Sequence, residues 1–200
     1  MSEVIDLWAA RTTTLRAKPN GEYIVVFENR GADIGATISH PHGQIYAFDH
    51  VPSRPARQLR SRWAPDFDSA ERTVLRTENW IVYTEHASVY PVSLRIAPLE
   101  RTADLPSLSQ THRESLASVL ITISRALDDL YHAPLPYMLW CNQSPRTVSD
   151  WPDAWLNFEI VSPWRDAHVP RYIAAVEVAT EEFFNPVDPA DIASQLRALV

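Results

Sequence analysis

The residues of this chain best suited to chemistry are the two histidines of the run His40-Pro41-His42-Gly43-Gln44. A neutral imidazole is a good nucleophile near pH 7, and it can also bind a metal ion. Three of the four glycines in the chain, Gly31, Gly35 and Gly43, lie within or close to this run. Glycine lets backbone N–H groups approach an anion closely, as phosphate binding requires. The pairing of histidines with a glycine-rich loop indicates phosphoryl or nucleotidyl transfer.

Metal binding is the other chemistry that the residues allow. A His-x-His pair on a strand would place both rings on one face, because side chains repeat every two residues. A complete zinc site needs three or four ligands, however, and nothing near His40 and His42 supplies the others convincingly. Histidines outside the motif are expected to be ordinary surface or core residues. The residues therefore favour His42 as a nucleophile.

Composition limits the class of protein. The formal net charge of −7 argues against general nucleic-acid binding, because no basic stripe is available to replace counterions along a phosphate backbone. A single cysteine, Cys141, excludes an intramolecular disulfide and fits a reducing compartment. The N-terminus does not resemble a secretory signal, and the uncharged helical stretch 115–124 is too short to cross a bilayer. We expect a cytoplasmic protein with neither nucleic acid nor membrane as a partner.

Hydrophobic patterning predicts the elements that position the motif. A helix is expected over residues 3–17, and strands over 23–27 and 44–48 enclose the glycine-rich loop. Residues 50–66, with three prolines, read as an irregular connection. A long helix with a capping box formed by Thr111 and Glu114 is expected to end before Pro134. The remaining expected elements are strands at 79–84, 92–97, 137–140 and 155–161 and a helix at 188–199.

These elements form an internal repeat. The order helix, strand, turn and His-x-His recurs later in the chain as helix, strand, turn and Asn157-x-Glu159, so the second copy has lost both histidines. The first copy lacks the two strands that precede the helix of the second copy. We therefore predict one and a half copies of a repeated unit, with a first part at 1–62 and a second part at 63–200.

The motif and its lead-in resemble a known family. The run Phe27-Glu28-Asn29-Arg30-Gly31, followed by Gly35 and by His40 to Gln44, is similar to the active-site signature of the galactose-1-phosphate uridylyltransferases, nucleotidyltransferases of the histidine-triad superfamily. The resemblance covers most of residues 20–180. It implies an α+β fold, in which a histidine-triad-like open antiparallel sheet is packed against helices.

The resemblance also implies a reaction of galactose metabolism. His42 would attack the α-phosphorus of UDP-glucose, releasing glucose 1-phosphate, and galactose 1-phosphate would then take UMP from the uridylyl-histidine. The amide of Gln44 would donate to the transferred phosphoryl oxygens without adding charge. Arg171 would supply a cation for the sugar phosphate, and Glu177 would bind sugar hydroxyls. The substrate-binding residues implied in this way are Asn29, Gly35, Ala36, Thr37, Gln44, Arg171, Tyr172 and Glu177.

Metal sites are where the chain departs from the family pattern. The resemblance implies zinc held by two cysteines and two histidines, but here only His40 matches an expected ligand. We therefore expect at most an incomplete zinc site. A second metal site, of one glutamate and three histidines, corresponds here to one carboxylate and three amides, a poor set of ligands for a transition metal. These four positions are Gln58, Asn142, Asn157 and Glu159.

Length is the second departure from the pattern. Family members normally carry a long further segment before the helix at 3–17, and without it strand 23–27 would form an unpaired apolar edge. We expect UDP-sugar and hexose 1-phosphate as substrates, with a complementary N-terminal chain or a homodimer completing the enzyme. Two alternatives stay open, namely a non-catalytic remnant or binding subunit, and a related nucleotide hydrolase or phosphorylase that uses the same histidine.

Overall fold

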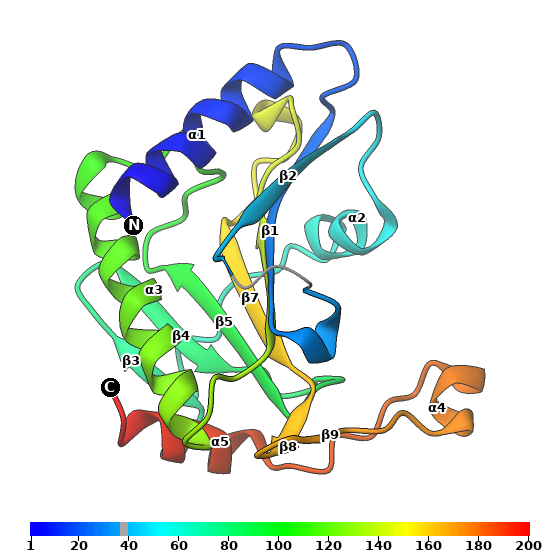
Figure 1. Ribbon diagram of the computed structural model, residues 1–200. Coiled ribbons are helices and arrows are strands. Elements are labelled where there is room, and N and C mark those ends of the chain that lie inside the picture. Colours follow the sequence, from blue (N-terminus) through cyan, green and yellow to red (C-terminus); the bar gives the residue numbers. More distant parts are fainter. Residues whose placement is uncertain (37–39) are drawn as a thin grey trace.

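A large antiparallel sheet forms the centre of the computed structural model, which describes residues 1–36 and 40–200 (Figure 1). Its seven strands lie in the order β2-β1-β6-β7-β5-β4-β3, and β8 and β9 pair separately. The strands are β1 Tyr23–Arg30, β2 Gly43–Phe48, β3 Thr73–Arg76, β4 Trp80–Thr84, β5 Val92–Pro98, β6 Tyr137–Asn142, β7 Asn157–Ser162, β8 Trp164–Asp166 and β9 Val169–Pro170. The expected α+β class and its open antiparallel sheet are confirmed.

Helices cover the two faces of the sheet unequally. Figure 1 shows α1, α3 and α5 on one face, α2 on the other, and α4 projecting from the body. None of the described helices combines the length and apolar character needed to span a bilayer. The α-helices are α1 Ser2–Arg16, α2 Ser53–Arg60, α3 Gln110–Leu130, α4 Ala175–Thr180 and α5 Pro189–Arg197; short 3-10 helices are Ala32–Ile34 and Val148–Asp150.

The hydrophobic core lies between α1, α3, α5 and the sheet. Leu116, Leu120 and Leu127 recur at helical spacing on α3, and all three are buried in this core. On β1 the alternation places Val26 in the same core, whereas Val25 points to the opposite face. Part of the opposite face, which carries only α2 and a small cluster around Ile81, Tyr83 and Ala97, is therefore available for a site.

The predicted repeat is visible in the topology. The elements α1, β1 and β2 form one helix–strand–strand unit, and α3, β6 and β7 form the other. The two units join where β1 pairs antiparallel with β6. Because one continuous sheet runs through both units, the boundary between the parts 1–62 and 63–200 stays a prediction.

The predicted unpaired edge at strand 23–27 is wrong. β1 pairs with β2 on one side and with β6 on the other. Within the described part of the chain the edge strand is β2, and every one of its side chains is exposed or half-buried. The prediction failed because it considered only neighbours in the sequence, whereas β6 comes from the second repeat unit.

Two local predictions are also wrong. The segment 50–66 contains α2, and its prolines Pro52 and Pro55 lie at the N-cap and in the first turn, where a missing N–H costs no helical hydrogen bond. The N-cap of α3 is Ser109, which accepts from the backbone N–H of His112 at 3.2 Å, so the Thr111 capping box does not form. The short strand β3 was not predicted, because four residues carry too little pattern.

Candidate active site

The face of the sheet opposite α1, α3 and α5 carries a row of polar and aromatic side chains. Gln44 on β2 lies opposite Phe27 on β1, which in turn lies opposite Trp140 on β6. Trp140 lies opposite Glu159 on β7, and Glu159 lies opposite Arg95 on β5. We call these five residues the central row. With strands about 4.8 Å apart, Gln44 and Glu159 are separated by roughly 14 Å.

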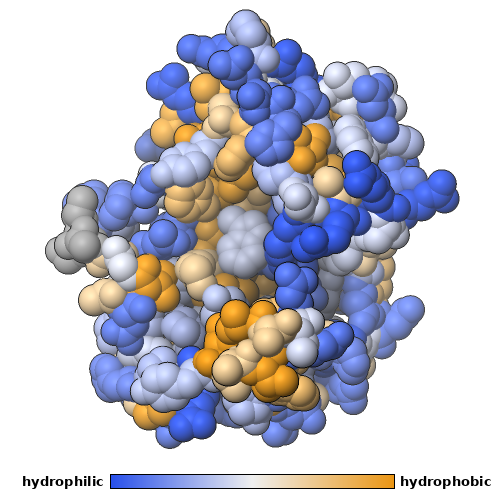
Figure 2. Space-filling model, turned by 90° about the vertical axis from the view of Figure 1, so that its right-hand side faces the viewer, coloured by the Kyte–Doolittle hydropathy of each residue, from blue (hydrophilic) through white to orange (hydrophobic). Residues whose placement is uncertain are grey.

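A cavity of about 470 Å³ opens on this face over four residues of the central row; Gln44 is not among its lining residues. Figure 2 shows the hollow near the middle of the molecule, with apolar residues around it. Its size lies within the range of small-molecule sites, and aromatic walls suit flat rings such as a nucleobase or a sugar. The apolar and aromatic lining residues include Tyr23, Val25, Phe27, Tyr46, Phe48, Pro52, Pro55, Val89, Tyr90, Trp140 and Val161.

The histidine motif lies at the start of β2, and both of its imidazoles are exposed. His42 Nδ1 lies 2.9 Å from the carbonyl oxygen of His40. A carbonyl oxygen can only accept, so we assign the proton of the neutral ring to Nδ1. The lone pair then resides on Nε2, on the other side of the ring. Because β2 begins at Gly43, the His-x-His pair does not lie within a strand, contrary to the strand geometry considered from the sequence.

The structure brings three of the predicted site residues together. Glu28 on β1 pairs with Gly43 on β2, so Asn29 and His42 follow next at the same end of the two strands. Gln44 lies two residues from His42 and two from Tyr46, which lines the cavity, so Gln44 faces the same side. Asn29, His42 and Gln44 therefore lie at the same end of β1 and β2, although none of the three lines the cavity itself. Their catalytic and binding roles stay predictions.

Two backbone N–H groups of the glycine-rich loop donate hydrogen bonds to carbonyl groups within the same loop. The N–H of Gly35 donates to the carbonyl of Ala32 at 2.9 Å, and that of Ala36 donates to the carbonyl of Gly31 at 3.1 Å. Phosphate binding by Gly35 and Ala36 stays a prediction, since both donors are engaged within the loop. Thr37, the third residue predicted here, lies outside the described residues.

The segment predicted to bind the hexose phosphate lies apart from the motif, because α4 projects from the body (Figure 1). Arg171 and Glu177 form a buried ion pair with each other. Glu177 also accepts from the N–H groups of Phe184 and Ala174 at 2.8 and 2.6 Å. These two hydrogen bonds and Arg171 hold the pKa of Glu177 below its ordinary value, although burial raises it. Tyr172, in contrast, is 78% exposed.

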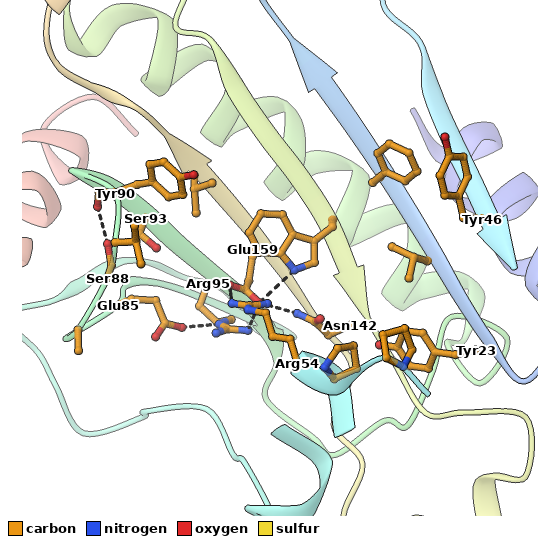
Figure 3. A pocket seen from close by; sticks show the side chains of 18 of the residues that line it. Tyr23, Tyr46, Arg54, Glu85, Ser88, Tyr90, Ser93, Arg95, Asn142 and Glu159 are labelled. Carbon is orange, nitrogen blue, oxygen red and sulfur yellow. Dashed lines mark hydrogen bonds and ion pairs between the residues drawn. The ribbon is translucent and has the colours of Figure 1, made fainter. Parts of the chain in front are cut away.

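Sequence reasoning missed two arginines at the floor of the cavity (Figure 3). Arg54 of α2 donates two hydrogen bonds of 2.7 Å to the carboxylate of Glu159, and Arg95 donates to Asn157 at 2.6 Å and lies 2.8 Å from Glu159. Arg95 also pairs with Glu85. Arg95 is the one charged residue of a fully buried strand, a pattern that signals a buried ion pair. No comparable signal marks Arg54 in the sequence.

The charge state of Glu159 follows from these contacts. Burial on its own raises the pKa of this carboxyl group, which is only 3% exposed. The hydrogen bonds from Arg54 and the charge of Arg95 outweigh burial, so the pKa of Glu159 lies below its ordinary value. The carboxylate is therefore ionised at neutral pH.

The residues at the two metal sites that the family resemblance implies do not form a set of metal ligands in the described chain. Within residues 1–36 and 40–200, no three or more His, Cys, Asp and Glu side chains gather in a metal-binding cluster. His40 Nδ1 instead lies 2.9 Å from the carbonyl oxygen of Pro41. At the second site the carboxylate of Glu159 is already bound by two guanidinium groups, those of Arg54 and Arg95. A role of zinc in this chain stays a prediction.

Two cations that could have served a phosphate are paired elsewhere. Arg30 lies 2.8 Å from Asp128 of α3, on the helix-covered side of the sheet, and its guanidinium stacks over Tyr137. Arg171 is taken by Glu177, as described above. Neither arginine lines the cavity. The negative charge of a nucleotide diphosphate is therefore not met by these two side chains.

Comparisons with known proteins agree with this fold and motif. The family models for the galactose-1-phosphate uridyl transferase N-terminal and C-terminal domains match residues 1–52 and 33–182. The galactose-1-phosphate uridylyltransferase of Thermotoga maritima is 30% identical over 98% of this chain and 66% of its own length. That of Streptomyces lividans is 33% identical over 84% of this chain and 54% of its own length.

A solved structure of a uridylyltransferase superposes with a TM-score of 0.88 at 23% identity, covering 99% of this chain and 67% of the other. At that identity the likeness establishes the fold alone. The chain thus spans between about half and two thirds of the length of the two curated relatives named above. Since the C-terminal domain model covers residues 33–182, the chain belongs to the galactose-1-phosphate uridyl transferase family.

Proposed function

We propose that this chain carries the nucleophile of a uridylyltransferase, which exchanges UMP between UDP-glucose and galactose 1-phosphate through a uridylyl group on His42. The observation that supports it best is the hydrogen bond of 2.9 Å between His42 Nδ1 and the carbonyl of His40. This bond fixes the tautomer and the ring orientation, so that Nε2 is free to attack phosphorus. A nucleophile oriented by a second group is typical of covalent catalysis.

The residues next to His42 suit a reaction in which negative charge is carried by the phosphoryl oxygens. In the first step a bond forms between Nε2 of His42 and the α-phosphorus, while the bond to the glucose 1-phosphate oxygen breaks. Gln44, which follows two residues later on the same face of the sheet as the cavity, would donate to the phosphoryl oxygens, and Asn29 would hold the phosphate or the sugar. The second step reverses the first with galactose 1-phosphate as the acceptor. The aromatic cavity provides room for the rings of the donor.

A second chain is part of the proposal. Arg30 and Arg171 are paired with carboxylates, so further cations are needed to offset the diphosphate. Tyr172, Val178 and Phe184 lie in or next to the projecting helix α4 and are exposed. Exposed apolar side chains of this kind suit a surface that a partner chain covers. A complementary N-terminal chain or a homodimer would supply the cations for the diphosphate and would bury these exposed apolar side chains. We place this assembly in the cytoplasm.

Trapping the intermediate tests the proposal. The chain, alone and with a complementary N-terminal segment from a relative, is incubated with UDP-glucose that carries label in its uridylyl group. We expect acid-labile label on His42, none in His42→Ala, and full labelling in His50→Ala, which removes an exposed histidine at the other end of β2. Absence of label under both conditions would refute the proposal.

The molecule that accepts the uridylyl group distinguishes a transferase from a phosphorylase or a hydrolase. Labelled protein is mixed in turn with galactose 1-phosphate, inorganic phosphate and buffer alone. Rapid appearance of UDP-galactose supports the transferase. Equally rapid release to phosphate or to water would instead assign a phosphorylase or a hydrolase that uses the same histidine.

A further inference from the structure

We propose that Arg54 and Arg95 act as a built-in cation at Glu159, in place of a metal ion, and that Arg54 thereby fixes α2 as one wall of the cavity. The proposal concerns the architecture of the cavity floor. It does not depend on the reaction proposed above.

Glu159 requires a permanent positive neighbour. It lies on the central strand β7 with only 3% of its surface exposed. A buried carboxylate is tolerated when it is paired and hydrogen-bonded, and costs much when it is not. Two arginines meet this need, since guanidinium stays charged at any pH a protein experiences.

The contacts of Glu159 oppose the binding of a metal ion, because they surround Oε1 and bring two guanidinium charges to the carboxylate. Oε1 accepts from Arg54 at 2.7 Å, from Asn142 at 2.8 Å and from Trp140 Nε1 at 3.1 Å, and Arg95 lies 2.8 Å from it. Oε2 accepts from Arg54 at 2.7 Å. A divalent ion would have to approach these oxygens to about 2.0–2.2 Å. At that distance it would face two like charges within hydrogen-bonding range of the same carboxylate.

Arg54 also helps to hold α2, which otherwise contacts the body through Ala56 and the half-buried residues Pro55, Gln58 and Leu59. Of the eight residues of α2, all described, only Ala56 is buried. The side chain of Arg54 extends from the first turn across the cavity floor, and its guanidinium lies 5.1 Å from the centre of the Trp140 ring. Pro52 and Pro55, on either side of Arg54 in the sequence, line the cavity. The bond between Arg54 and Glu159 is therefore the polar contact that ties this wall to the central strand β7.

Hydrogen exchange of the full chain tests the role of Arg54. We expect the amides of residues 53–60 to exchange about tenfold faster in Arg54→Met than in wild type, because the helix loses its charged anchor. Arg57→Met is the matched control, since Arg57 is exposed on the same helix and should exchange as wild type does. If Arg54→Met is too unstable to measure, Arg54→Lys replaces it; lysine keeps the charge but cannot form both bonds, so exchange should still rise. Equal exchange in the Arg54 and Arg57 variants would overturn the proposal.

Metal analysis tests the claim that Arg54 and Arg95 take the place of a metal ion at Glu159. Purified wild type should contain only substoichiometric zinc, iron or manganese, and its Tm should be the same in EDTA and with each of these ions added. A stoichiometric metal that disappears in Glu159→Gln would show that the carboxylate binds an ion and would overturn the proposal. A Tm that falls in EDTA for wild type but not for Glu159→Gln would do the same.

Discussion

Replacing Gly31 by alanine should destabilise the fold much more than the same change at Gly35. Gly31 has φ +100° and ψ 148°, a region open essentially to glycine alone. A Cβ on Gly31 would lie 2.7 Å from Cβ and 3.0 Å from Cα of Pro136, just before β6. Gly35 has φ +82° in the left-handed region, and a Cβ there meets nothing within 4 Å. The two glycines share a positive φ but differ in their surroundings.

The expected magnitudes follow from these surroundings. At Gly31 the backbone conformation costs an alanine ~1–3 kcal/mol, and the clash with Pro136 adds ~1–3 kcal/mol. At Gly35 only the left-handed conformation counts, at about 1–2 kcal/mol. We therefore expect Gly31→Ala to be the less stable variant by roughly 1–4 kcal/mol.

Urea unfolding of wild type, Gly31→Ala and Gly35→Ala measures this difference. Midpoints are compared only where the m-values agree, so that all three proteins expose the same surface on unfolding. Gly31→Ala equal to or more stable than Gly35→Ala would refute the reasoning. It would mean that the loop moves away from Pro136 at little cost, and that Gly31 is not there for close packing.

Three further predictions concern the core, the buried carboxylate and the thiol. Leu127→Ala should lose ~2–5 kcal/mol of unfolding free energy, because Leu127 is fully buried, whereas Ile121→Ala, at a position 38% exposed on the same helix, should lose under about 1 kcal/mol by the same urea assay. Since the pKa of Glu159 is lower in the folded state than its unfolded value of about 4.3, its ionisation stabilises the fold above that pH, and this stability is lost as the pH falls below it. Tm in acid should therefore fall more steeply for wild type than for Glu159→Gln, and identical slopes would contradict the assignment. Burial raises the pKa of the Cys141 thiol, so a thiol reagent at pH 8 should react only after denaturation; rapid reaction of the native protein would count against this burial.

Elements with a strong local pattern are predictable from the sequence. The helix α3 and the strands β1, β4 and β5 follow from apolar residues repeating at helical or strand spacing, and these patterns are local. The histidine motif and its glycine-rich lead-in indicated the family for the same reason, since both lie within eighteen consecutive residues, 27–44. The helix α2 was not predicted because its prolines suggested an irregular segment, whereas they lie at the N-cap and in the first turn, where proline is tolerated.

The residues of the site also divide into those that a local sequence pattern predicts and those that depend on tertiary contacts. His42, Gln44 and Asn29 were identified from one short segment, and the pairing of β1 with β2 brings them together. This arrangement is predictable from the sequence, because neighbouring residues and one hairpin are enough to form it; the chemistry assigned to it stays a prediction. The floor of the cavity required the tertiary structure, because Arg54, Arg95 and Glu159 come from segments far apart in the chain. Only the register of β5, β6 and β7 and the docking of α2 decide that a buried carboxylate meets two guanidinium groups.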